Sequence, residues 1–228
     1  YPLRRQRQMC IRDRPKAGIA SSNWIAESAK WTEEKHSPDL SLVYLPHLDY
    51  DLQRLGPNDP KISKALNEID QVVGELISFY EKRGIRLIIL SEYGITEVKN
   101  VIYPNRVFRN KGWLSIKDEL GLEYLDCGGS KAFTITDHQV AHVYLQDESP
   151  RFRKEVRNCL ESMEGVEKIL EGESRKEAGL NHERSGDFVI FSKEDAWFAY
   201  YHWLDDSLAP DFARCVDVHL SLIHISEP

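Results

Sequence analysis

Two stretches of the chain place acidic and imidazole side chains directly after apolar runs. They are residues 42–57, LVYLPHLDYDLQRLGP, and residues 86–95, RLIILSEYGI. The side chains concerned are His47, Asp49, Asp51 and Glu92. Carboxylates and imidazoles together are ligands that divalent cations of the zinc, manganese and iron type accept in proteins. The pattern therefore predicts a divalent metal site whose main ligands are Asp49 and Glu92.

The other polar side chains of this pattern have two open interpretations. His47 and Asp51 are metal ligands or loop residues whose hydrogen bonds orient a ligand. His138 and His142, in TDHQVAH, are further candidate ligands because residues four apart share a face of a helix or a strand. Together with Asp137 they could equally form a polar turn, since short polar residues favour hairpin tips.

The elements that would position these side chains follow from the apolar pattern. Residues 41–46 and 86–90 have no helical period and indicate strands buried on both faces. Residues 47–60 are expected to form the loop that follows the first strand. Residues 61–83 have apolar positions at helical spacing and end before Gly84. Strand, helix and strand predict a βαβ unit with parallel strands, whose carboxyl ends meet at the rim where ligands bind. The expected fold class is α/β, a mostly parallel sheet flanked by helices.

The remaining chain alternates between helical and strand patterns. Helices are expected at residues 22–33, 104–112 and 151–163. Strands are expected at residues 113–117, 122–125, 132–136, 139–145, 166–170 and 187–192. Those at 132–136 and 139–145 are expected to form a hairpin around Asp137 and His138, and the strand at 166–170 is expected at the edge of a sheet. We interpret residues 15–95 as an α/β core segment, 96–186 as a mixed strand and helix cap, and 187–219 as a return to the core that includes the aromatic run WFAYYHW.

Composition narrows the class of protein. The chain has 228 residues, a net charge of −7 and four cysteines without metal-site spacing. An acidic chain argues against a general binder of nucleic-acid polymers, and no apolar run is long enough for a transmembrane helix. Residues 1–14 and 220–228 resemble translated sequencing-adapter sequence from gene fragments assembled out of mixed DNA. We expect them to be artefactual tails on an incomplete domain.

The two stretches, with NHERSGDFVIFS and AWFAYYHW further on, resemble the alkaline-phosphatase superfamily in its nucleotide pyrophosphatase/phosphodiesterase branch. There the first strand precedes a P-D-x-x-G-H-x-x-G-P run and the second precedes S-D-H-G. The resemblance covers roughly residues 40–219. It implies two metal ions, commonly zinc, and a Thr or Ser nucleophile near the N-terminus of the family domain.

Only some family positions are matched. Asp49, seven residues before Gly56, stands at the first-motif Asp, but the following His position holds Gln53. Ser-Asp-His-Gly becomes Ser-Glu-Tyr-Gly, so that Tyr93 replaces the second His. These departures put two ligands in doubt. For the first, His47 or Asp51 could substitute; the second favours fewer or harder metals, or coordination through a different His such as His138 or His142. His182 matches the H-x-x-x-G-D histidine, for which we expect a structural role.

The resemblance implies a metal-dependent hydrolase of phosphodiester or nucleotide pyrophosphate bonds that acts on a small phosphorylated substrate, such as a nucleotide. No nucleophile motif precedes residue 42, so we expect a fragment that is inactive alone. One alternative is a binding or interaction protein that retains the fold with a decayed metal site. Another is a superfamily hydrolase or isomerase for a different phospho- or sulfo-ester. Localisation and oligomeric state stay open.

Overall fold

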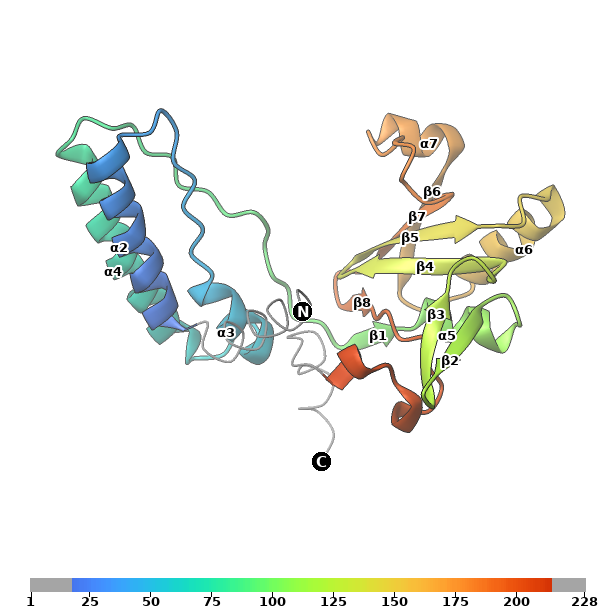
Figure 1. Ribbon diagram of the computed structural model, residues 1–228. Coiled ribbons are helices and arrows are strands. Elements are labelled where there is room, and N and C mark those ends of the chain that lie inside the picture. Colours follow the sequence, from blue (N-terminus) through green and yellow to red (C-terminus); the bar gives the residue numbers. More distant parts are fainter. Residues whose placement is uncertain (1–17, 215–228) are drawn as a thin grey trace. The chain divides into compact units, whose positions relative to one another are not determined.

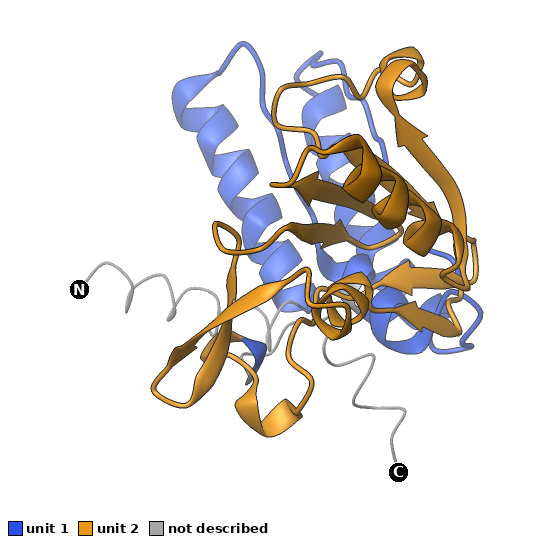
Figure 2. Ribbon diagram, turned by 90° about the vertical axis from the view of Figure 1, so that its right-hand side faces the viewer, with its two compact units in different colours: residues 1–96, 213–228 blue, residues 97–212 orange. Residues whose placement is uncertain are grey.

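The computed structural model describes residues 18–214 (Figure 1). Within them the chain forms two compact units, residues 18–96 with 213–214, and residues 97–212 (Figure 2). The boundary at residue 96 lies where the sequence changes from the α/β pattern of residues 15–95 to a mixed strand and helix pattern. The expected artefactual tails, residues 1–14 and 220–228, lie outside the described residues.

The first unit is built on two long helices that lie side by side, α2 (Ile19–His36) and α4 (Ile62–Glu81) (Figure 1). The buried side chains of α4 recur every three or four residues: Ala65, Ile69, Val72, Leu76 and Tyr80. That spacing places them on one face, which packs with Ala26 of α2 into a small hydrophobic core. The helix predicted at residues 61–83 is confirmed.

The two strands predicted in this unit do not form. Residues 41–46 and 86–90 are extended, but the structure assigns no strand to either one. Leu42 is 90% exposed and Ile88 78% exposed. A strand exists only when its backbone N–H and C=O groups pair with a neighbouring strand, and the described part of this unit supplies none. The predicted βαβ unit with parallel strands is therefore not formed within the described residues.

The prediction of a loop at residues 47–60 is wrong for the first half of that segment. It begins with a helix, α3 (His47–Leu55), which ends before Gly56 at a φ of 80°. The leucines, Gln53 and Arg54 favour a helix, and Asp49 lies in its first turn, where a negative charge complements the helix dipole.

The second unit contains a four-stranded antiparallel sheet with the order β4-β5-β7-β6. Its strands are β4 (Ala132–Asp137), β5 (Val140–Leu145), β6 (Val166–Glu171) and β7 (Phe188–Ser192). The predicted hairpin at Asp137 and His138 and the edge position of residues 166–170 are both confirmed. Since β7 lies between β5 and β6, residues 188–192 share a sheet with the segments interpreted as a cap, not with residues 15–95.

Smaller elements complete this unit. The helices are α5 (Pro104–Asn110), α6 (Pro150–Glu161) and α7 (Gly172–Glu177), and a 3-10 turn follows, η1 (Asp206–Leu208). A second 3-10 turn, η2 (Asp211–Arg214), crosses the unit boundary at residue 212. An antiparallel pair, β2 (Ser115–Glu119) and β3 (Leu122–Asp126), is separate from the main sheet.

The balance of strand directions differs from the expectation. Among the described residues one pair is parallel, β1 (Asn100–Ile102) with β8 (Ala196–Phe198). All pairs of the four-stranded sheet are antiparallel, so a mostly parallel sheet is not what residues 18–214 display. The coarser expectation of an α/β protein with helices and sheets holds. No helix in the described part of the chain is long and apolar enough to cross a bilayer.

Candidate functional site

Asp49 lies at the centre of the best-defined polar cluster among the predicted site residues. Its half-buried carboxylate accepts hydrogen bonds from Gln53 Nε2, which is 2.9 Å from both Oδ1 and Oδ2. Tyr93 Oη donates to Asp49 Oδ1 at 2.5 Å. The HLDYD and SEYG motifs, far apart in sequence, therefore meet at this carboxylate.

The helical conformation of α3 divides the predicted cluster into two faces. Residues four apart share a face, whereas residues two apart point about 200° away from each other. Asp49 therefore lies on the same side as Gln53, and Asp51 on the same side as His47. In consequence His47 and Asp49, expected to act together, point in different directions.

His47 and Asp51 have partners of their own. The His47 ring is buried, and its Nε2 lies 3.1 Å from Glu68 Oε2 on α4. Its Nδ1 is buried without a hydrogen-bond partner among the described residues. Asp51 Oδ1 accepts from Arg54 Nη2 at 2.7 Å on the surface of the helix. These contacts fit helix packing and a local ion pair, so neither residue is brought to Asp49.

The environment of Tyr93 keeps its hydroxyl protonated. Partial burial raises the pKa of Tyr93 well above its ordinary value, and the Asp49 carboxylate beside it and Tyr44 raise it further. A phenol that holds its proton donates a hydrogen bond and is a weak metal ligand. Ser91 Oγ donates to Tyr93 O at 2.7 Å and fixes the local turn.

Glu92 is exposed in the same turn. It neighbours Tyr93 in sequence, but no contact brings its carboxylate to Asp49. The prediction that these two carboxylates bind one cation stays a prediction.

His138 and His142 do not share a strand. His138 is the first residue of the two-residue loop between β4 and β5, with a φ of 54°, and it is exposed. His142 lies within β5, where its Nδ1 accepts from the backbone N–H of Gly186 at 3.1 Å. Only Nε2 of His142 is then available to another partner. Both residues belong to the second unit, and Asp49 to the first.

The H-x-x-x-G-D segment has a clear structural basis. His182 Nδ1 accepts from the backbone N–H of Arg184 at 3.2 Å, as expected for a structural histidine. A Cβ at Gly186 would lie 2.6 Å from Val143 O, so only glycine fits beside β5. Asp187 Oδ1 accepts from Arg153 Nη2 at 2.6 Å, and its Oδ2 from the backbone N–H of Leu145 at 2.9 Å.

A divalent cation requires several donors whose lone pairs converge on one point. At Asp49 the two contacting groups, the Gln53 amide NH₂ and the Tyr93 hydroxyl, present hydrogens to the carboxylate instead. Residues 18–214 contain no group of three or more His, Cys, Asp or Glu that could hold a metal ion. The arrangement at Asp49 therefore does not fit the metal that the resemblance implies.

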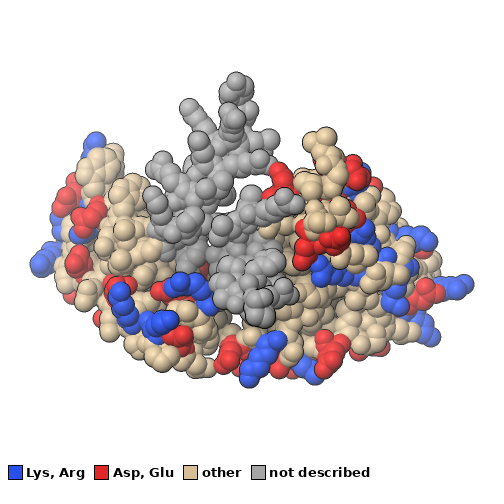
Figure 3. Space-filling model, turned by 90° about the horizontal axis from the view of Figure 1, so that it is seen from below, with Lys and Arg blue, Asp and Glu red and all other residues tan. Residues whose placement is uncertain are grey.

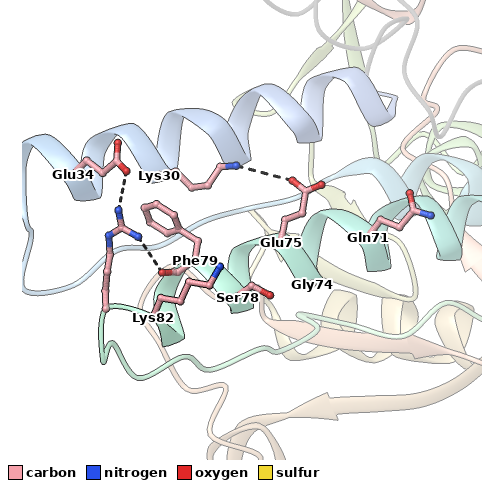
Figure 4. Close-up of a pocket in the computed structure, with 9 residues that line it drawn as sticks. Lys30, Glu34, Gln71, Gly74, Glu75, Ser78, Phe79 and Lys82 are labelled. Carbon is pink, nitrogen blue, oxygen red and sulfur yellow. Dashed lines mark hydrogen bonds and ion pairs between the residues drawn. The ribbon is translucent and has the colours of Figure 1, made fainter.

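An open groove of about 900 Å³ runs between α2 and α4 (Figure 4). It is lined by Lys30, Glu34, Gln71, Gly74, Glu75, Ser78, Phe79, Lys82 and Arg83. Its charged groups pair across it, because Arg83 Nη2 donates to Glu34 Oε1 at 2.8 Å and Lys30 Nζ lies 4.0 Å from Glu75 Oε2 (Figure 4). The groove includes none of the predicted site residues and carries no sign of a reactive centre.

On the described part of the face seen in Figure 3, acidic and basic side chains are interspersed without a continuous basic patch. Affinity for a nucleic-acid polymer depends on clustered basic side chains. The expectation that the chain does not bind such polymers stays a prediction.

Sequence reasoning treated Gln53 and Tyr93 only as departures from a motif. The structure makes both direct partners of Asp49. The spacing of four between Asp49 and Gln53 is a signal for a helical side-chain pair, but it is informative only once the segment is known to be a helix. No sequence signal joins Tyr93 to Asp49.

Comparison with known proteins agrees with the motifs. A family model described as type I phosphodiesterase / nucleotide pyrophosphatase matches residues 7–218. An uncharacterised pyrophosphatase/phosphodiesterase of Schizosaccharomyces pombe is 35% identical over 81 residues, which are 33% of this chain and 17% of that protein.

Two groups of solved structures share the fold. Phosphonoacetate hydrolase from Sinorhizobium meliloti 1021, in complex with phosphonoacetate, aligns with a TM-score of 0.54 and 19% identity over 84% of this chain and 47% of its own. Murine ectonucleotide pyrophosphatase / phosphodiesterase 5, in complex with AMP, aligns with a TM-score of 0.56 and 17% identity over 79% of this chain and 45% of its own. The chain thus spans about half the length of these neighbours.

Proposed function

Because the chain belongs to the type I phosphodiesterase/nucleotide pyrophosphatase family of the alkaline-phosphatase superfamily, we propose that it forms part of a hydrolase of phosphodiester or nucleotide pyrophosphate bonds. The observation that supports this most directly is the match of the type I phosphodiesterase / nucleotide pyrophosphatase family model over residues 7–218. The reaction breaks a P–O bond to a leaving group and transfers the phosphorus group finally to water.

The proposed substrate is a small phosphorylated molecule, such as a nucleotide. Solved neighbours were captured with small phosphorus-containing ligands, the nucleotide AMP in one and the phosphonate phosphonoacetate in the other. We propose that the nucleophile, a Thr or Ser, lies upstream of the family motifs and is absent from this chain, so that this chain by itself is inactive. Substrate and activity of the whole enzyme are proposals, since the chain spans about half of each neighbour.

We also propose that the activity depends on a divalent metal, zinc, manganese or iron. As arranged here, Asp49 does not fit as a ligand of that metal. Glu92, His138 and the free Nε2 of His142 are the ligand candidates to test. Elemental analysis of purified protein tests them, with Glu92→Ala and His142→Ala beside the unchanged chain. A stoichiometric metal that either substitution removes would identify a ligand.

The activity test uses the product of the full-length gene and this chain alone. Both are assayed with bis-p-nitrophenyl phosphate and with the p-nitrophenyl ester of a nucleoside 5′-monophosphate; p-nitrophenyl sulfate tests the alternative ester class. Turnover of the phosphodiesters by the full-length protein only is the expected result. Brisk metal-dependent turnover by this chain alone would refute the proposed inactivity, and no turnover by either protein would refute the hydrolase.

The contacts of Asp49 favour a second candidate function. Two neutral donors occupy a carboxylate that would otherwise be free for catalysis. A protein that retains the fold to bind a phosphorylated ligand without cleaving it would tolerate this arrangement. Equilibrium binding of AMP to the full-length protein, measured together with the assay above, separates the two functions, because a binding protein retains AMP affinity and shows no turnover.

A further inference from the structure

The two residues that depart from the family motifs both contact the same carboxylate. Gln53 stands where the first motif has a His, and Tyr93 stands where the second has one. Gln53 Nε2 lies 2.9 Å from each oxygen of Asp49, and Tyr93 Oη lies 2.5 Å from Oδ1. Gln53 and Tyr93 are therefore neighbours in space around Asp49, although 40 residues separate them in sequence.

Helix geometry alone explains only half of this arrangement. A Gln and an Asp four residues apart on a helix commonly form a hydrogen bond. Tyr93 belongs to another segment, and its hydroxyl reaches Asp49 across 44 positions of sequence. Ser91 Oγ, by donating to Tyr93 O at 2.7 Å, holds the turn that presents the ring. Tertiary structure, not local periodicity, brings the second donor to the carboxylate.

The chemistry of the two donors differs from that of the residues they replace. A neutral imidazole offers a lone pair and can share a cation with a carboxylate. An amide NH₂ and a phenol O–H offer hydrogens, and they satisfy the lone pairs of the carboxylate directly. With the Gln53 amide in this orientation, a cation placed among these hydrogens would meet repulsion from both donors.

We propose that Gln53 and Tyr93 occupy the place of a divalent cation at Asp49, so that hydrogen bonds instead of metal coordination join α3 to the turn at Ser91. This inference rests on the family membership and on the contacts of Asp49, and not on the proposed hydrolase activity. It predicts that restoring the two imidazoles creates a metal site with three ligands: Asp49, His at 53 and His at 93. Three protein ligands with a water are sufficient for zinc.

The test is isothermal titration calorimetry with zinc chloride at pH 7.5 on the full chain. The unchanged protein and Asp49→Ala are expected to show the same zinc isotherm, because Asp49 binds no zinc. The double variant Gln53→His, Tyr93→His is expected to gain one site per chain that binds at least tenfold tighter than any site of the unchanged protein. Adding Asp49→Ala to the double variant is expected to abolish that site.

The control is the pair Gln53→Ala, Tyr93→Phe, which removes both donors without adding imidazoles and is expected to gain no tight site. One equivalent of zinc in the unchanged protein that Asp49→Ala removes would overturn the proposal. A folded double histidine variant without a new site would overturn the roles of Gln53 and Tyr93. Should that variant not fold by circular dichroism, the comparison of the unchanged chain with Asp49→Ala decides. An active hydrolase with zinc at Asp49 would refute this inference and leave the proposed function intact.

Discussion

The side chain of Asn105, on α5, makes three hydrogen bonds to one residue of β4. Its Oδ1 accepts from the backbone N of Thr134 at 2.7 Å and from Thr134 Oγ1 at 2.9 Å, and its Nδ2 donates to Thr134 O at 2.9 Å. Both residues are 1% exposed. Because β4 is an edge strand, the amide of Asn105 satisfies backbone groups that no neighbouring strand could reach.

Asn105→Leu is therefore expected to destabilise the second unit by about 3 kcal/mol, since it leaves a buried N–H and a buried C=O unpaired. Chemical denaturation followed by circular dichroism measures the loss. The control is Asn158→Leu on α6, where the asparagine is exposed and the change should stay within about 0.5 kcal/mol. Equal effects of the two substitutions would contradict the role given to Asn105.

Gly186→Ala is expected to destabilise the second unit by roughly 3 kcal/mol. The new methyl group would lie 2.6 Å from Val143 O, 2.7 Å from Val143 N and 2.9 Å from Phe188 O, and these backbone atoms belong to paired strands that cannot shift freely. Thermal unfolding monitored by near-ultraviolet circular dichroism detects the loss of packing.

The matched control is Gly74→Ala in α4. A Cβ there meets nothing within 4 Å, and alanine favours a helix interior over glycine, so the substitution should stabilise the first unit by about 0.5–1 kcal/mol. The two glycine substitutions are thus expected to have opposite signs. A neutral Gly186→Ala would show that β5 and β7 do not approach as closely as described.

Periodicity predicts the elements whose partners are close in sequence. The helix α4 follows from its repeating apolar positions, and the β4–β5 hairpin follows from alternation on both sides of Asp137 and His138. The parallel pair β1 and β8 was not predicted, because three-residue strands almost 100 residues apart leave no local pattern. Their pairing depends on tertiary contacts alone.

The sequence predicted which residue types gather near the candidate site, but not the directions in which their side chains point. An apolar run followed by HLDYD was interpreted as a strand and a loop, and in a loop His47 and Asp49 could converge. In the helix that forms, they point apart, and Asp49 faces Gln53. Spacing of side chains indicates which residues meet only after the secondary structure is known, and for residues 41–46 that depends on strand partners not found among residues 18–214.

Acid is expected to weaken the second unit through His202. Burial lowers the pKa of the His202 imidazole, and the positive charge of Arg109 adds to this, whereas the hydrogen bond between Nε2 and Glu123 O, 3.0 Å long, acts in the opposite direction. In the unfolded chain the His202 imidazole binds a proton with its ordinary pKa of 6.5, whereas in the folded protein it binds a proton only at lower pH. Stability is therefore complete above pH 6.5 and falls as the pH drops below it, by up to about 1.4 kcal/mol per pH unit.

The free energy of unfolding, measured at pH 7.5 and 5.5, checks this direction. His202→Gln keeps a hydrogen-bond donor but does not titrate, so it should lose less stability between the two pH values than the unchanged protein. A larger acid loss in His202→Gln would contradict the assigned sign.

Exposed apolar side chains at residues 88–90 are expected to drive self-association of this chain. Ile88, Ile89 and Leu90 are 78%, 61% and 77% exposed in an extended segment whose backbone forms no ladder. Such a run is a template for pairing with a second copy, and a charge in it blocks that pairing. The double variant Ile88→Lys, Leu90→Lys should therefore lower light scattering at 37 °C several-fold and leave the unfolding of the second unit unchanged.

Leu120→Lys is the control, because this leucine is fully exposed at a turn and outside any apolar run. If Leu120→Lys reduces scattering equally, net charge and not the extended segment governs association.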